Sequence, residues 1–106
     1  MIVPRAWIQQ RDFDAAVAAV EKSLAPDVVR VRYTVGEDWD GSKPAVYFRV
    51  LLADKTASRE RLLDTATHAA DTIRDGIEPF EMWGVWPYFD YRLASEQARL
   101  RDPAWD

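Results

Sequence analysis

The chain has 106 residues with a formal net charge of −4, and it contains no cysteine. The lack of cysteine excludes disulfides, cysteine-ligated zinc and thiol nucleophiles, and no stretch approaches the roughly 18 apolar residues of a membrane-spanning helix. The acidic balance argues against non-specific binding of nucleic acid by the molecule as a whole. We therefore expect one small cytoplasmic domain that does not bind membranes.

The first predicted element is a helix over residues 12–25. Its apolar side chains recur at helical spacing, at Phe13, Val17, Val20 and Leu24. Asp12 is a suitable N-cap, and Pro26 follows the last turn, where it would end the helix.

Two strands joined by a loop follow this helix. Residues 29–35 alternate between apolar and polar side chains, which is the period of a half-buried strand, and residues 45–53 are rich in Val, Phe, Tyr and Leu. The turn-rich residues 36–44 between them predict a hairpin. The side chains of the second strand that should face the core are Val46, Phe48, Val50 and Leu52.

A second helix and a third strand complete the pattern. The helix has an apolar stripe formed by Leu62, Ala66, Ala69, Ile73 and Ile77. Gly76, followed by Pro79, is expected to mark its end. Residues 85–92 are predicted to form the third strand, and Pro87 favours a position at the edge of the sheet.

The order of these elements predicts an α+β fold with the sequence α-β-β-α-β. We expect a two-layer sandwich in which a three-stranded sheet has both helices packed on one face. Residues 1–93 form this single domain, and residues 94–106 form a C-terminal tail with a short helix at most. Such an arrangement leaves the second face of the sheet open.

Arginine and aromatic side chains dominate the predicted open face. Strand alternation places there Arg30, Arg32, Thr34, Tyr47, Arg49, Leu51, Trp86, Tyr88, Asp90 and Arg92. Tyr, Trp and Arg are enriched at protein interfaces, whereas planar cations and aromatic rings also suit stacked bases with phosphates. Two further readings remain: the face is solvated, or the C-terminal tail folds over it and buries Trp105.

The hairpin loop has several acidic residues around a tryptophan. Glu37, Asp38 and Asp40 precede Gly41, as in a calcium loop, but the twelve-residue pattern with a closing Glu is missing. We therefore expect an Asx-type turn that stabilises the hairpin, and no metal site. Trp39 is expected to fold back over the edge of the core, with the anchoring of a partner as the other reading.

No catalytic or cofactor-binding pattern stands out. Arg61 and His68 match the Arg-x(6)-His spacing of one superfamily of helical ribonucleases, but those enzymes are all-α. Helical periodicity also places His68 on the solvated side of its helix. The four glycines are scattered and form no phosphate-binding loop. The sequence thus predicts no catalytic residue, no cofactor and no metal ligand.

The segment after Pro79 is dense in apolar side chains. These are Phe80, Met82, Trp83, Val85 and Trp86. Part of this set is expected to enter the core, and the remainder is expected to form an exposed apolar patch of the kind that marks interaction sites.

Three segments have a recognisable residue pattern: residues 38–41 (Asp-Trp-Asp-Gly), 44–50 (Pro-Ala-Val-Tyr-Phe-Arg-Val) and 83–92 (Trp-Gly-Val-Trp-Pro-Tyr-Phe-Asp-Tyr-Arg). Together they resemble a group of small uncharacterised bacterial proteins that are encoded beside a second small gene, in toxin–antitoxin-like or defence-associated pairs. The resemblance covers residues 28–93 and leaves out the first helix and both ends. It implies a partner-binding role, and no catalytic residue is carried over from it.

The leading hypothesis is a non-enzymatic protein-interaction module, antitoxin-like or a subunit of a small bacterial complex, which binds a partner protein or a second copy. The alternative is an RNA-binding or single-stranded nucleic-acid-binding domain that uses the same sheet face. The residues predicted to bind the partner are Arg30, Arg32, Tyr47, Arg49, Trp86, Tyr88, Arg92 and Trp39. Whether the protein has a small-molecule ligand is left open.

Overall fold

The computed structural model describes residues 3–106 and has the predicted α+β class. Its sheet is mixed, with three strands in the order β1 (Val28–Glu37), β2 (Pro44–Leu52) and β3 (Trp86–Leu93). β1 and β2 are antiparallel, whereas β2 and β3 are parallel. Parallel neighbours need a long crossover, which the helical residues between β2 and β3 provide. Pro87 lies in an edge strand, as predicted.

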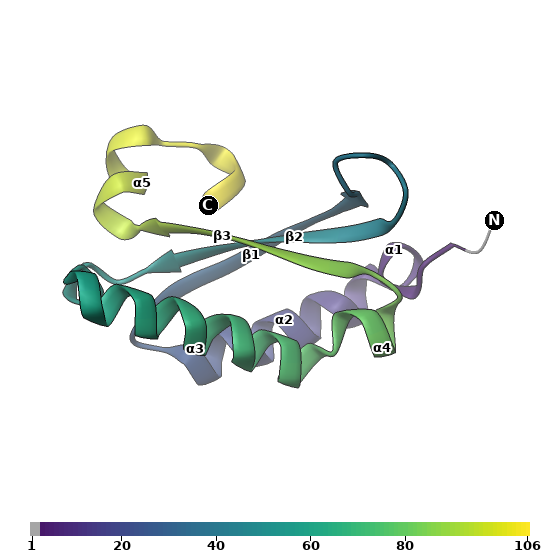
Figure 1. Ribbon diagram of the computed structural model, residues 1–106, viewed down its shortest axis with the longest axis horizontal. Coiled ribbons are helices and arrows are strands. Elements are labelled where there is room, and N and C mark those ends of the chain that lie inside the picture. The colour runs from purple at the N-terminus through teal and green to yellow at the C-terminus, as the bar shows by residue number, and fades with distance from the viewer. Residues whose placement is uncertain (1–2) are drawn as a thin grey trace.

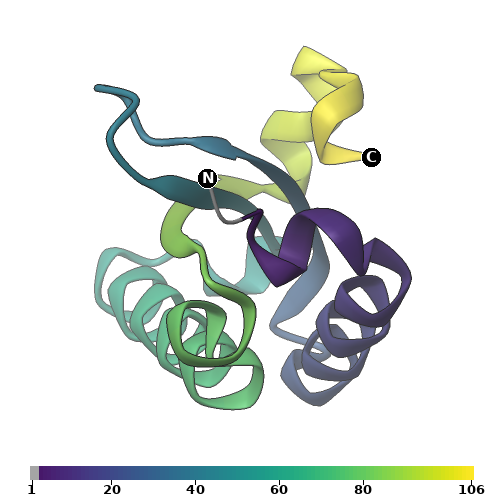
Figure 2. The same ribbon diagram turned by 90° about the vertical axis from the view of Figure 1, so that its right-hand side faces the viewer.

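Two long helices lie on one face of the sheet. α2 (Gln10–Leu24) and α3 (Arg59–Ile77) run side by side beneath the strands in Figure 1, and Figure 2 shows them end-on. α2 begins two residues earlier than predicted, so Asp12 lies in its first turn and is not the N-cap. A carboxylate in this turn still stabilises the positive end of the helix dipole.

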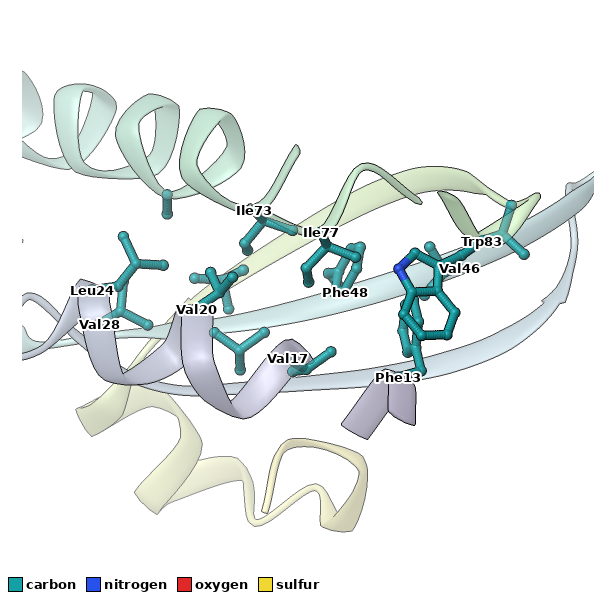
Figure 3. Packing of buried hydrophobic residues seen from close by; sticks show 14 of the residues in the cluster. Phe13, Val17, Val20, Leu24, Val28, Val46, Phe48, Ile73, Ile77 and Trp83 are labelled. Carbon is teal, nitrogen blue, oxygen red and sulfur yellow. The ribbon is translucent and has the colours of Figure 1, made fainter. Parts of the chain in front are cut away.

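The core lies between these helices and the sheet (Figure 3). The β2 side chains predicted to face inward are all buried, namely Val46, Phe48, Val50 and Leu52. Phe13 packs edge-on against Tyr33 and Trp83, with ring centroids 4.7 and 5.0 Å apart. Phe48 stacks on Phe89 of the neighbouring strand. Such aromatic pairs contribute about 0.5–1.5 kcal/mol each beyond the burial of their area.

The end of α3 differs from the prediction, which assigned the stop to Gly76. The helix continues to Ile77, and Glu78 takes the left-handed conformation with φ 52°. Gly76 instead serves the packing of the helices, because a Cβ at this position would lie 2.9 Å from Cγ2 of Val20 on α2. The glycine thus allows α2 and α3 to approach each other closely.

Two short helices lie together at one end of the molecule. They are α1 (Arg5–Ile8) and α4 (Pro79–Trp83), and the Arg5 guanidinium lies 4.2 Å from the ring centroid of Trp83. Helices of this length are too short to show an apolar stripe in the sequence. None of the helices in residues 3–106 has the length and apolar character needed to cross a membrane.

The C-terminal residues pack on the opposite face of the sheet. After β3 the chain forms α5 (Ala94–Leu100) and the 3₁₀ turn η2 (Pro103–Trp105), which lie across the sheet from α2 and α3 (Figure 1). A further 3₁₀ turn, η1 (Asp54–Thr56), follows β2. Residues 94–106, called here the C-terminal segment, therefore cover part of the face that the sequence predicted to be open.

Candidate interaction surface

The sheet face opposite α2 and α3 is organised in rows that cross the three strands. The register aligns each outward-facing residue of β2 with one neighbour on β1 and one on β3. The four rows are Arg30, Leu51 and Arg92; Arg32, Arg49 and Asp90; Thr34, Tyr47 and Tyr88; and Gly36, Ala45 and Trp86. The first row lies beside the C-terminal segment, and the last row lies beside the hairpin loop.

The C-terminal segment covers the first row. Trp105 is 4% exposed, and the Arg92 guanidinium lies over its ring, 4.5 Å from the centroid. Nη1 of Arg30 donates a hydrogen bond of 3.2 Å to the main-chain carbonyl of Trp105. Leu51 is 3% exposed although it points away from the core, because η2 packs against its strand. The reading in which the tail folds over this face and buries Trp105 is confirmed here.

Arginine side chains and one buried amide hold the segment in place. Nε of Arg32 donates to the main-chain carbonyl of Asp106 at 3.1 Å. Gln97, which is 5% exposed, accepts from Nη1 of Arg92 at 2.8 Å and donates to the carbonyl of Asp102 at 2.6 Å. Three of the four arginines that were predicted to bind a partner therefore bind the C-terminal segment of the chain itself.

In the other half of the face, Trp86 and Tyr88 are exposed and Tyr47 and Arg49 are half-buried. There the rings of Tyr47 and Tyr88 stack, with centroids 5.3 Å apart and an interplanar angle of 19°. The Tyr47 hydroxyl donates to the main-chain carbonyl of Glu37, which fixes the position of the ring. Nη1 of Arg49 donates to Oγ1 of Thr34 at 2.7 Å. A depression of about 250 Å³ lies between β2 and β3 among these side chains.

Trp86 and Phe80 extend this surface toward α4. Their ring centroids are 4.7 Å apart, and the two residues are 39% and 51% exposed. Nζ of Lys43 lies 4.7 Å from the Trp86 ring centroid. Trp86 and Tyr88 are two residues apart in β3 and so share one side of the strand. The rings therefore form one continuous surface, called here the aromatic strip, made of Tyr47, Tyr88, Trp86 and Phe80.

The apolar segment after Pro79 divides between core and surface, as predicted. Trp83 and Val85 are buried, at 7% and 0% exposed. The exposed members are Phe80, Met82 and Trp86. The sequence did not identify Phe80 as a surface residue, because the short α4 turn decides which of these side chains face outward. The available signal was its place in the same apolar segment as Trp86.

Trp39 lies in the hairpin loop and is 89% exposed. The prediction that it folds back over the edge of the core is wrong. The loop rises from the sheet on the side opposite the long helices, away from the core between these helices and the sheet (Figures 1 and 2). The exposure of Trp39 is compatible with the other interpretation, in which this side chain anchors a partner.

Carboxylate side chains of the hairpin loop accept hydrogen bonds from main-chain N–H groups of the same loop. Asp38 and Asp40 each accept a hydrogen bond of 2.9 Å from the N–H of Ser42, and Asp38 also accepts one from the N–H of Lys43. The contacts confirm an Asx-type turn, and the hydrogen bonds from Ser42 lower the pKa of the Asp40 carboxyl below its ordinary value. Across residues 3–106, no cluster of three or more potential ligand side chains is placed to hold a metal ion.

The two residues that match the ribonuclease spacing lie in ordinary surface environments. His68 is exposed on α3, as predicted. Arg61 forms an ion pair with Asp27, with 3.6 Å between Nη2 and Oδ1. This pairing gives Arg61 a structural partner and gives no support to a catalytic role for His68.

Comparison with known proteins finds no match among protein-family models, curated protein sequences or solved structures. The resemblance to small bacterial proteins encoded in gene pairs stays a prediction. The geometry of the sheet face is therefore the basis for assigning a function.

Proposed function

We propose that this chain is a non-enzymatic protein-interaction module that binds a partner protein through the aromatic strip and Trp39. The observation that supports this proposal is the gathering of aromatic side chains, most of them exposed, at one end of the sheet. Exposed apolar patches of this kind mark interaction sites on proteins. Tyr and Trp in such patches are the residues that most often provide the binding energy of an interface.

Polar and charged groups surround the aromatic strip. Lys43 lies over the Trp86 ring, and Arg49 lies in the row next to Tyr47, where it donates a hydrogen bond to Thr34. Asp38 and Asp40 are acidic groups near the strip. Partial burial, followed by the influence of Asp38, Tyr47 and Asp40, raises the pKa of Tyr88 above its ordinary value. An apolar centre with a polar rim is the usual anatomy of a protein–protein interface.

The arrangement of the arginines favours a protein partner over nucleic acid. A single-strand binder needs several free cations along the path of the phosphates. Arg30, Arg32 and Arg92 instead bind the C-terminal segment, and Arg92 lies against the Trp105 ring. The exposed half of the face thus offers rings for contact with few cations beside them.

The resemblance described above indicates which partner to test first. It implies that a second small protein is encoded next to this one, and that this chain neutralises or positions it. An antitoxin-like role, or that of a subunit in a small complex, is the form of partner binding that we propose. The product of the neighbouring gene is therefore the first candidate.

The experiment compares wild type with the double variant Trp86→Ala and Tyr88→Ala. Both residues lie on the edge strand and are more than a third exposed, so the fold should tolerate their loss. Leu63→Ala is the control, because Leu63 is 69% exposed but lies on α3. Sedimentation velocity with the neighbouring gene product should show a complex for wild type and for the control. The double variant should have a dissociation constant at least tenfold higher, which corresponds to a loss of about 1.4 kcal/mol or more in binding free energy.

Two results would contradict the proposal. One is a double variant that binds as tightly as wild type, once wild type has been shown to form the complex. The other is a wild type that stays unbound to the protein partner and shifts single-stranded RNA at low salt, with a steep loss of binding as salt rises. A protein interface built on aromatic contacts should weaken little with salt.

A further inference from the structure

A second surface lies on the helix side of the molecule, along the outer edge of β1. β1 is an edge strand, since the strand order is β1, β2, β3. A groove of about 560 Å³ runs between residues 31–35 of this strand and the side of α2 from Gln10 to Glu21. In the aromatic strip, Tyr47, Tyr88 and Trp86 lie on the other face of the sheet and Phe80 lies on α4 beside the opposite edge strand, so binding in this groove does not depend on the function proposed above.

Main-chain groups of β1 face this groove. In an antiparallel ladder, successive residues turn their N–H and C=O groups alternately toward the partner strand and away from it. The hydrogen bond from the Asp38 N–H to the Lys43 carbonyl continues the β1–β2 ladder, so the even-numbered residues of β1 face β2. The main-chain groups of Tyr33 and Val35 therefore face outward, and they have no hydrogen-bond partner in the described part of the chain.

At Val31 the main-chain groups of this edge already have side-chain hydrogen-bond partners. The Val31 N–H donates to Oε2 of Glu21 at 2.8 Å, and its carbonyl accepts from Nη1 of Arg32 at 3.1 Å. Nη1 of Arg32 also donates to Oε2 of Glu21 at 3.2 Å, so the Glu21 and Arg32 side chains together occupy both main-chain groups of Val31. Charged side chains commonly protect edge strands in this way. The edge that can accept another strand thus begins at Tyr33 and continues toward the hairpin.

The opposite edge of the sheet is less suited to strand addition. Pro87 in β3 has no N–H to donate. The Tyr91 hydroxyl donates to the carbonyl of Ala66 at 3.2 Å and so ties β3 to α3. β1 is therefore the edge with the better geometry for pairing.

The α2 side of the groove favours a basic ligand. One carboxylate oxygen of Asp14 accepts a hydrogen bond from the Tyr33 hydroxyl. Burial, together with this bond, raises the pKa of Tyr33, so the hydroxyl remains the donor at neutral pH. Glu21 is already paired with Arg32, whereas Asp14 has a second oxygen to offer a cation. The small side chain of Ala18 leaves room between the two acids for a long ligand side chain.

We propose that this groove binds an extended segment of a partner protein, which adds a fourth strand beside Tyr33 and Val35 and places a lysine or arginine against Asp14. Strand addition is a common mode of peptide recognition, in which main-chain bonds provide affinity and side-chain contacts provide specificity. A second copy of this chain fits less well. A symmetric pairing of two β1 edges places the same surface on both sides, and this would bring the Asp14 carboxylates of the two copies to one interface without a cation between them.

The test uses ¹⁵N-labelled full-length protein and a short capped peptide in which lysine and valine alternate. Addition of the peptide should shift the amide resonances of Tyr33 and Val35 and slow their hydrogen exchange, with little change at Trp86. A peptide with glutamate in place of lysine should bind about threefold more weakly or worse, as expected for an exposed ion pair. A lysine peptide N-methylated at every residue should not bind, because it has no N–H to donate.

Charge variants of the protein test the contact with Asp14. Asp14→Lys should weaken the lysine peptide and strengthen the glutamate peptide, each by about threefold or more. Asp64→Lys makes the same change of charge at an exposed position of α3 and should alter neither. Asp14→Asn keeps an acceptor for the Tyr33 hydroxyl and should shift the affinities in the same direction if the lysine variant does not fold.

Several outcomes would overturn the proposal. They are unchanged amides of Tyr33 and Val35 at saturating peptide, equal binding of the N-methylated peptide, and equal effects of the Asp14 and Asp64 variants. The proposal would also be overturned if the protein without peptide sedimented as a dimer and its Tyr33 and Val35 amides were already protected from hydrogen exchange, because a second copy would then occupy the edge. None of these results bears on the aromatic strip, so the two proposals fail separately.

Discussion

Replacement of Trp105 by alanine tests whether the C-terminal segment truly covers the first row of the sheet face. Trp105 is 4% exposed, and its ring lies against the Arg92 guanidinium. A tryptophan buries about 200 Å², which at about 25 cal/mol per Å² corresponds to an upper bound of about 5 kcal/mol. The segment can move away and so relieve part of the cavity. We therefore expect Trp105→Ala to lower the free energy of unfolding by about 2–4 kcal/mol.

Urea denaturation followed by circular dichroism measures this loss. Trp39→Ala is the matched control, because it removes the same side chain from a position that is 89% exposed. This control should change the free energy of unfolding by less than about 0.5 kcal/mol. Hydrogen exchange adds a local readout: amides of residues 94–106 should exchange faster in Trp105→Ala than in wild type, and at the wild-type rate in the control.

A loss below about 1 kcal/mol for Trp105→Ala, or equal losses in the two variants, would refute this reasoning, because a buried tryptophan side chain contributes more than that. Unchanged exchange in residues 94–106 would lead to the same conclusion. The division of the sheet face into a covered half and an exposed half would then be wrong. Arg30, Arg32 and Arg92 would return to the candidate binding surface, and the case for nucleic acid would gain strength.

Three other substitutions test the core and the edge of the fold. Ile73→Ala should lower the free energy of unfolding by about 2–5 kcal/mol in urea, and a loss below about 1 kcal/mol would place Ile73 outside the core. Gly76→Ala should destabilise the protein by about 1–3 kcal/mol, because the new Cβ meets Val20. That loss should shrink in a Val20→Ala background, and a stabilised Gly76→Ala would mean that helix propensity outweighs the contact. Burial and the hydrogen bond to Asp14 raise the pKa of Tyr33 in the folded state. Protonated Tyr33 therefore contributes fully to the free energy of unfolding below its ordinary pKa of about 10, and this contribution is lost as the pH rises through the folded-state pKa. Tyr33→Phe should thus be less stable than wild type at neutral pH, and the gap should narrow in alkaline urea titrations; a constant gap would contradict this.

The candidate surface could be predicted in part. Alternation along the strands placed Tyr47, Trp86 and Tyr88 on one side of the sheet before any contact was known, and the structure shows them there. Phe80 was missed because its direction depends on the turn of α4, which is too short to have a period. The groove along β1 was missed because an edge is defined by strand order, and local patterns do not determine strand order.

The sequence by itself determined the two long helices, the three strands and the inward side chains of β2 and α3, because side-chain direction repeats with the period of the local backbone. Phe48 and Ile73 are buried for that reason, and His68 is exposed for the same reason. Only the tertiary structure decided the position of Trp105 over the first row and the exposure of Trp39. Both depend on contacts, or on the lack of them, between segments distant in the chain, and no local period records these contacts.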